Sequence, residues 1–174
     1  MRLVLLAATY TGSVAVAPTG SKPWGGGQAA AKPPRDLLRR SAYARFETIQ
    51  TRWNDMEAQG HVNNAVYHNY IDDAVNVHLA RSGVSSEVRR FTSENSCRYL
   101  RQLAWPTPVE VGLRCRPGRA SAAYQLGLFA EGAEEASAVG TFTHVYVDER
   151  GKPCTMDPSA RAALGPLAPD DGLW

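Results

Sequence analysis

Cysteine is scarce in this chain: only three occur among 174 residues, and they lie far apart. An odd, widely spaced set fits neither a framework of paired disulfides nor the close ligand spacing of a zinc site. We therefore interpret Cys97, Cys115 and Cys154 as small buried apolar residues rather than as nucleophiles or ligands. The chain also lacks a Gly-rich phosphate-binding loop and any metal-ligand spacing, so we expect neither a metal nor another cofactor.

Long apolar runs and a strong charge of one sign are missing from the main part of the chain. No run after residue 42 is long enough to span a bilayer. Residues 1–42 contain six basic side chains and one acidic side chain, a net charge of +5. The whole chain carries +2, which leaves −3 for residues 43–174. A mildly acidic domain is a poor binder of nucleic acid, so we disfavour that class.

The first 42 residues look like a leader rather than part of a folded core. Residues 1–17 have the outline of a signal peptide, and residues 18–40 are basic, acid-poor and rich in Pro and Gly, as in an organelle transit segment. We expect this leader to target the protein to an organelle, a plastid or a mitochondrion; the alternative is a leader without a targeting role in a cytoplasmic protein. We place one domain at residues 43–156 and a loose C-terminal tail at residues 157–174.

The elements predicted within this domain indicate the α+β class. A strand is expected at 43–53 and a helix at 64–82, with Gly83 beyond its last turn. Four further strands are expected at 91–100, 109–116, 122–129 and 135–148, separated by Pro and Gly turns. Alternation within 109–116 and 122–129 predicts the side chains that face the core: Val109, Val111, Leu113, Cys115, Ala122, Tyr124, Leu126 and Leu128. A helix followed by a run of strands favours an antiparallel sheet on a central helix.

The most informative stretch is 51–70, which reads TRWNDMEAQGHVNNAVYHNY. The carboxylates of Asp55 and Glu57 precede a loop with His61, and an Asn pair follows where the predicted helix begins. Asn is a favoured helix N-cap. The free N–H groups and the dipole of a helix N-terminus can stabilise a developing oxyanion, and a carboxylate or an imidazole beside it can activate water. The arrangement suits hydrolysis of an acyl group.

The run RWNDMEAQGHVNN, followed by a helix, resembles the hotdog-fold acyl thioesterases, in particular the 4-hydroxybenzoyl-CoA thioesterase-like group. It is also similar to the plant acyl-carrier-protein thioesterases, whose pattern is W-x-D-x-D-x-N-x-H-V-N-N. The resemblance implies a hotdog fold, with an antiparallel sheet wrapped around one long central helix. It further implies hydrolysis of an acyl-CoA or acyl-carrier-protein thioester without a cofactor. Such enzymes assemble as homodimers or homotetramers, with the site at the protomer boundary.

The resemblance assigns roles to individual residues. Glu57 stands where these families have a catalytic Asp, as general base or nucleophile; its side chain is one methylene longer. Asp55 is interpreted mainly as structural, with catalysis as the alternative. His61 is either a general base or a structural residue. Asn64 is expected to offer its backbone N–H to the thioester oxygen.

Further residues are candidates for substrate contact. Gln59 could orient the carboxylate or a water, Gly60 would let the loop backbone approach the substrate, and Asn63 is expected to be a cap or loop clasp. Tyr67 lies on the apolar face of the helix and is included with them. Five arginines could clamp phosphates or dock an acidic carrier protein, or could simply be solvated on strand faces: Arg98, Arg101, Arg114, Arg116 and Arg119. His78 is expected in the core, and His144 either lines the acyl pocket or is structural.

Two other functions remain open at this point. A hotdog enoyl-thioester hydratase or dehydratase would also need a carboxylate and a His beside a bound thioester. A non-catalytic acyl-thioester-binding module is suggested by the exchange of Asp for Glu at position 57.

Overall fold

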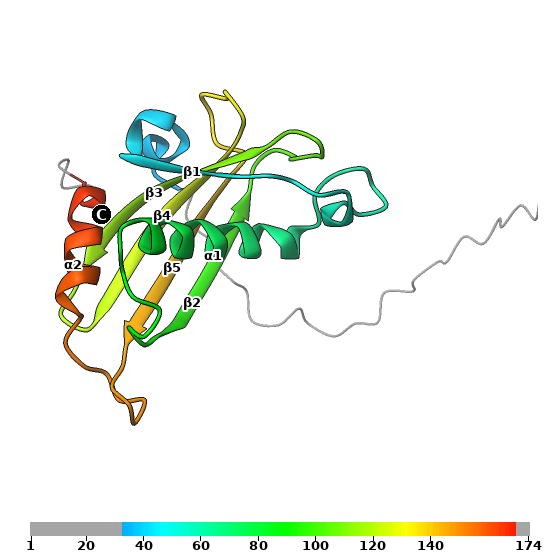
Figure 1. Ribbon diagram of the computed structural model, residues 1–174. Coiled ribbons are helices and arrows are strands. Elements are labelled where there is room, and N and C mark those ends of the chain that lie inside the picture. Colours follow the sequence, from blue (N-terminus) through cyan, green and yellow to red (C-terminus); the bar gives the residue numbers. More distant parts are fainter. Residues whose placement is uncertain (1–32, 170–174) are drawn as a thin grey trace, which may run out of the picture. The chain divides into compact units, whose positions relative to one another are not determined.

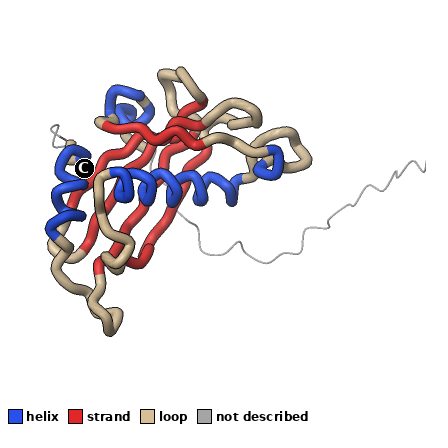
Figure 2. The backbone as a smooth tube through the Cα atoms, viewed as in Figure 1, coloured by secondary structure: helices blue, strands red, loops and turns tan. Residues whose placement is uncertain are grey.

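The computed structural model describes residues 33–169, and five of its segments form one antiparallel sheet (Figures 1 and 2). The strand order is β1-β3-β4-β5-β2. The strands are β1 (Arg45–Ile49), β2 (Arg90–Tyr99), β3 (Val109–Pro117), β4 (Ser121–Ala130) and β5 (Ala138–Tyr146). The predicted layout of a helix followed by antiparallel strands is confirmed, and among the described residues β2 lies at an edge of the sheet, paired only with β5.

The predicted alternation in the two central strands is also confirmed. All eight side chains expected to face the core are at most 1% exposed and belong to one apolar cluster: Val109, Val111, Leu113, Cys115, Ala122, Tyr124, Leu126 and Leu128. The same cluster includes Phe142 and Tyr146 of β5, whereas Val139 belongs to a second, smaller cluster. Because side chains alternate across a strand, the two clusters lie on opposite faces of the sheet.

Two strands are shorter than the sequence suggested. β1 ends at Ile49, and a 3₁₀ turn (Trp53–Asp55) replaces the expected end of the strand. Trp53 does not share a strand face with Ile49; it is 70% exposed and packs edge-to-face against Trp105 at a centroid distance of 5.4 Å. β5 begins at Ala138 rather than at residue 135.

The helix α1 (Asn64–Arg81) lies along the face of the sheet that carries the larger cluster (Figure 1). It ends one residue before the predicted boundary, and Gly83 follows with φ +81°. Ile71 reaches the sheet at Gly140, where an added Cβ would lie 2.8 Å from the Ile71 Cδ1 atom. The missing side chain of Gly140 therefore allows the close approach of the helix. No helix within residues 33–169 is long and apolar enough to cross a membrane.

The C-terminal segment is not the loose tail that the sequence suggested, as far as residue 169. A second helix, α2 (Pro158–Leu164), is capped by Asp157, whose carboxylate accepts from the Ser159 N–H at 2.8 Å. Its buried residues recur at helical spacing: Ala160, Ala163, Leu164 and, in the next turn, Leu167. The ring of His78 on α1 lies 3.1 Å from the Ala163 carbonyl oxygen. His78 is thus a buried residue with a hydrogen-bond partner, as predicted, and α1 is accompanied by a short second helix.

Residues 33–42 also belong to the fold rather than to a separate leader. Two 3₁₀ turns (Arg35–Leu38 and Arg40–Ala42) lead to Tyr43, which belongs to the smaller cluster. Arg40 makes a bidentate ion pair with Glu110 of β3, with distances of 2.8 and 2.9 Å. The composition of residues 33–42 does not reveal these contacts, because they join segments that are far apart in the chain. The targeting signals proposed for residues 1–32 lie outside the described residues.

Candidate active site

A tight hairpin between Met56 and Val62 brings Glu57 and His61 together. The Glu57 N–H donates to the His61 carbonyl at 2.9 Å, and the Gly60 N–H donates to the Glu57 carbonyl at 3.0 Å. Gly60 has φ +81°, a conformation that favours glycine, and open space surrounds its Cα. The turn leaves the Glu57 Oε1 atom 3.3 Å from the His61 Nε2 atom, with about a quarter of each side chain exposed.

Asp55 fastens the base of this hairpin to α1. Its side chain is almost fully buried, and its Oδ2 atom accepts hydrogen bonds from the Arg52 N–H and the Tyr70 hydroxyl, each at 2.7 Å. Its Oδ1 atom accepts from the Arg52 guanidinium at 3.0 Å. Burial alone would raise the pKa of Asp55, but the hydrogen bonds from Arg52 and Tyr70 outweigh burial, so this pKa lies below its ordinary value. An ionised carboxylate with this many donors is suited to holding the loop.

The N-terminus of α1 is capped as the sequence predicted. The Asn63 side chain accepts from the Ala65 N–H at 2.9 Å, and the Asn63 N–H donates to the Asp55 carbonyl at 2.9 Å. Asn64 is the first helical residue, and its N–H, like the others of a first helical turn, has no acceptor within the helix. Together with the helix dipole, this N–H can polarise a carbonyl placed at the helix start.

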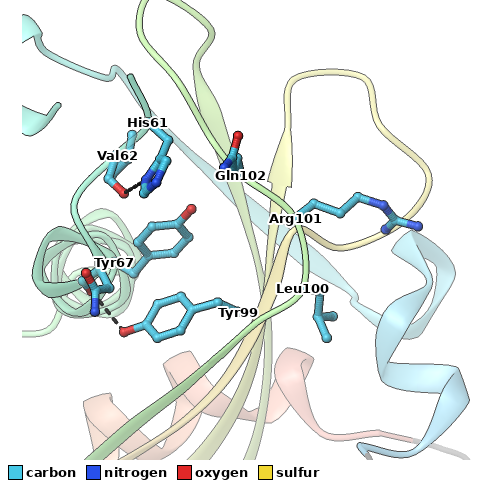
Figure 3. Close-up of a pocket in the computed structure, with 8 residues that line it drawn as sticks. His61, Val62, Tyr67, Tyr99, Leu100, Arg101 and Gln102 are labelled. Carbon is cyan, nitrogen blue, oxygen red and sulfur yellow. Dashed lines mark hydrogen bonds between the residues drawn. The ribbon is translucent and has the colours of Figure 1, made fainter. Parts of the chain in front are cut away.

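A groove of about 400 Å³ opens beside this turn (Figure 3). Three residues selected from the sequence line it: His61, Asn64 and Tyr67. Glu57, Asp55, Gln59, Gly60 and Asn63 are not among the lining residues. The imidazole of His61 therefore faces the groove, while Glu57 contacts that imidazole from the hairpin.

The two nitrogens of His61 both approach acceptors. The Nδ1 atom lies 3.3 Å from the Val62 carbonyl oxygen (Figure 3), and the Nε2 atom faces Glu57. A neutral imidazole has one N–H and can donate to only one of these acceptors, whereas an imidazolium can donate to both. The Glu57–His61 pair can thus hold a proton at the edge of the groove.

The opposite wall of the groove was not predicted, apart from Arg101 as a candidate phosphate contact. It comes from the end of β2 and the following loop: Tyr99, Leu100, Arg101 and Gln102. The Tyr99 hydroxyl donates to the Asn64 carbonyl at 3.0 Å, and its ring packs edge-to-face on Tyr67 at 5.0 Å. The sequence predicted a strand at 91–100. It did not show that the antiparallel direction of β2 brings the end of this strand beside the start of α1. The available signal in the sequence was the pair of large apolar residues at the end of that predicted strand, Tyr99 and Leu100, both of which are more than 40% exposed in the structure.

Of the five arginines proposed as a phosphate clamp, only Arg101 lines this groove. Arg101 also forms an ion pair with Glu135. Arg114 is buried in the middle of β3. Arg116 and Arg119 lie at the opposite end of the sheet from the groove. Because β2 and β3 run in opposite directions, the end of β3 is at the level where β2 begins.

None of the cysteines lines the groove. Cys115 is fully buried, in agreement with its interpretation as a core residue, and burial raises the pKa of the half-buried Cys97 thiol to about 11. Within residues 33–169, no cluster of three His, Cys, Asp or Glu side chains could hold a metal ion.

Comparison with known proteins decides the family. Residues 51–164 match the family model described as the thioesterase-like superfamily. The chain belongs to this superfamily. The fold is accordingly a hotdog-like thioesterase fold with a five-stranded antiparallel sheet and a helix on one face. No curated protein matches the chain.

Several solved structures resemble this chain over about two thirds of its length or more. The PA5185 protein of Pseudomonas aeruginosa is 40% identical, with a TM-score of 0.73, over 76% of this chain and 97% of that one. A thioesterase from Thermus thermophilus, complexed with coenzyme A and Zn, is 26% identical, with a TM-score of 0.62, over 72% and 95% of the two chains. A 1,4-dihydroxy-2-naphthoyl-CoA thioesterase from Synechocystis is 12% identical, with a TM-score of 0.64, over 68% and 93%, and so shows the fold alone.

Proposed function

We propose that this protein is a thioesterase that hydrolyses an acyl-CoA, or an acyl-carrier-protein thioester, to a free acid and a thiol. The observation that carries this proposal is the Glu57–His61 pair beside the first turn of α1, at the edge of a groove lined by His61, Asn64 and Tyr67. Membership of the thioesterase-like superfamily supports hydrolysis. The coenzyme A complex of the Thermus thermophilus relative favours a CoA thioester.

In the proposed reaction the thioester carbonyl rests at the start of α1. Its oxygen accepts a hydrogen bond from the Asn64 N–H, which stabilises the negative charge that develops during attack. Glu57 either takes a proton from the attacking water and later passes it to the leaving thiolate, or attacks the carbonyl carbon itself, displacing the thiolate and forming an acyl–Glu57 anhydride that water then hydrolyses to the free acid. In both routes the C–S bond breaks, and the leaving thiolate takes up a proton. His61 holds the Glu57 carboxylate through the Oε1 atom, which fixes the position of the longer Glu side chain.

The assembly proposed from the resemblance, a homodimer or homotetramer, fits two features of one protomer. Glu57 contacts His61 but does not line the groove of a single chain, so a second protomer at this boundary would complete the part of the site that faces Glu57. β2 pairs with β5 on one side only, and most of its residues are exposed. An open strand edge of ten residues is a surface on which another chain can pair.

The test is Glu57→Gln, with Glu131→Gln as a control on an exposed turn. Thiol release is followed with a thiol-detecting dye, on acyl-CoA and acyl-carrier-protein substrates of several chain lengths. Loss of a base or nucleophile should lower kcat by about 100-fold or more. Binding of a non-hydrolysable acyl-CoA thioether should change little, because the shape is kept. Light scattering on the same samples should give the mass of a dimer or a larger assembly.

A wild-type rate in Glu57→Gln would refute the assignment of Glu57. Water addition to an enoyl thioester without thiol release would instead identify a hydratase. Analogue binding by the wild type without turnover of any thioester would identify a binding module.

A further inference from the structure

A second cavity lies at the opposite end of β2 from the candidate active site. Its volume is about 380 Å³, and it shares no lining residue with the groove at the start of α1. Its lining is mainly polar and comes from α1, the loop after α1, the start of β2, and β5: Asp72, Asn76, Ser86, Val88, Arg89, Arg90, Phe91, Thr92 and His144. Nothing in the proposed thioesterase reaction uses these residues.

His144 contributes a buried nitrogen without a partner. The residue is 3% exposed, and within residues 33–169 no group makes a hydrogen bond to its Nδ1 atom. Edge-to-face contacts with Phe142 and Tyr124, at 4.8 and 6.0 Å, hold the ring in place. Burial, helped by the charge of Arg90, lowers the pKa of His144 to about 4, so the imidazole is neutral near pH 7. A neutral ring can still donate a hydrogen bond from Nδ1.

Arg90 brings a positive charge that the neighbouring side chains do not pair. Its guanidinium donates to two neutral oxygens, the Val88 carbonyl at 3.2 Å and the Asn76 side chain at 2.8 Å. Its Nε atom is buried and has no partner within residues 33–169. No carboxylate of that part of the chain forms an ion pair with Arg90. A part-buried cation with only neutral partners favours an anion beside it.

The remaining charges around the cavity leave a net positive balance. Arg89 also lines it, and one of its guanidinium nitrogens donates to the Glu149 carbonyl at 3.0 Å. Asp72 is the one acidic side chain among the lining residues. Burial and the neighbouring charge of Asp73 raise the pKa of Asp72, while the charge of Arg90 lowers it, so Asp72 feels the Arg90 charge without forming an ion pair with it. The hydroxyl groups of Ser86 and Thr92 are further available donors.

We propose that this cavity binds a small oxyanion, a phosphate or a carboxylate group, between Arg90 and His144. The Arg90 Nε–H and the His144 Nδ1–H donate to its oxygens, and the Arg90 charge balances it. The site is separate from the thioesterase groove, so it stands or falls independently of the proposed function.

The experiment is a titration of the full chain with sodium phosphate and, separately, sodium acetate, at constant ionic strength against sodium chloride. Calorimetry and the imidazole ¹⁵N signals of His144 report binding, and those signals are assigned with His144→Phe. We expect saturable binding of phosphate or acetate that moves the His144 signals. Arg90→Gln should weaken that binding about tenfold or more, because a charge-assisted hydrogen bond and the charge are lost.

Arg116→Gln, on the exposed end of β3, is the control and should bind as the wild type does. Saturation by phosphate alone identifies a phosphoryl group as the ligand, and saturation by acetate alone identifies a carboxyl group. If Arg90→Gln does not fold, His144→Phe serves in calorimetry and should likewise weaken binding. Binding no stronger than that of chloride, His144 signals that do not move, or equal affinity in wild type and variants would overturn the proposal.

Discussion

Removal of the Tyr70 hydroxyl tests whether Asp55 fastens the hairpin that carries Glu57 and His61 to α1. In Tyr70→Phe the ring stays and only the hydrogen bond to the Asp55 Oδ2 atom, 2.7 Å long, is lost. A hydrogen bond to a charged group contributes about 1.5–3 kcal/mol to stability. Both side chains are at most 2% exposed, so water cannot replace the lost donor. Urea denaturation near pH 7 should therefore show a loss of unfolding free energy of about that size.

Tyr99→Phe is the matched control for this experiment. Its hydroxyl also makes one hydrogen bond to α1, but to the neutral carbonyl of Asn64, and the residue is 43% exposed. The expected loss is about 1 kcal/mol or less, because the bond is neutral and water can replace it.

The pH dependence of the same variant gives an independent check. The pKa of Asp55 in the folded protein lies below its ordinary value of 3.8, so the folded state binds fewer protons than the unfolded state in that range. The stabilisation is therefore fully present above the ordinary pKa and is lost as the pH falls through the folded one. The cost of Tyr70→Phe should shrink on acidification below about pH 4. Equal costs for Tyr70→Phe and Tyr99→Phe, constant from neutral to acid pH, would refute the reasoning.

Two further predictions concern stability. The pKa of His144 in the folded protein is lowered to about 4 from an ordinary 6.5. On acidification the His144 imidazole is therefore protonated first in the unfolded state. The free energy of unfolding falls as the pH drops below 6.5 and becomes constant below pH 4. The unfolding free energy should fall by about 2 kcal/mol between pH 7 and pH 5 through this residue, and His144→Phe should remove that part of the urea-measured slope; an unchanged slope would contradict it. Arg40→Met should lower the unfolding free energy by about 1 kcal/mol, since its bidentate pair with Glu110 is partly exposed, while Arg116→Met should not; equal melting temperatures would show that residues 33–42 are not held by this pair.

Local patterns in the sequence predicted local structure well. The Asn pair placed the start of α1 at Asn64, because capping depends on residues within one turn. The alternation of Val109, Val111 and Leu113 identified the buried face of β3, because the side-chain period of a strand is fixed. The motif also placed Glu57 and His61 in one short loop.

What the sequence did not reveal depends on contacts between distant residues. The wall of the groove at Tyr99 follows from the path of β2, and the position of Arg40 depends on Glu110, seventy residues away. The position of Glu57 behind His61, rather than directly in the groove, results from the hairpin turn at Gly60. The buried helix α2 was missed because its Ala-rich sequence was interpreted by composition, although Ala160, Ala163 and Leu164 have helical spacing.

The hydroxyl of Tyr99 connects the outermost strand with the first carbonyl of the long helix. Tyr99 is the last residue of β2, so the edge of the sheet and the first turn of α1 share a direct contact. Under the proposed function and assembly, a second chain that pairs along β2 would lie next to the turn that receives the thioester oxygen.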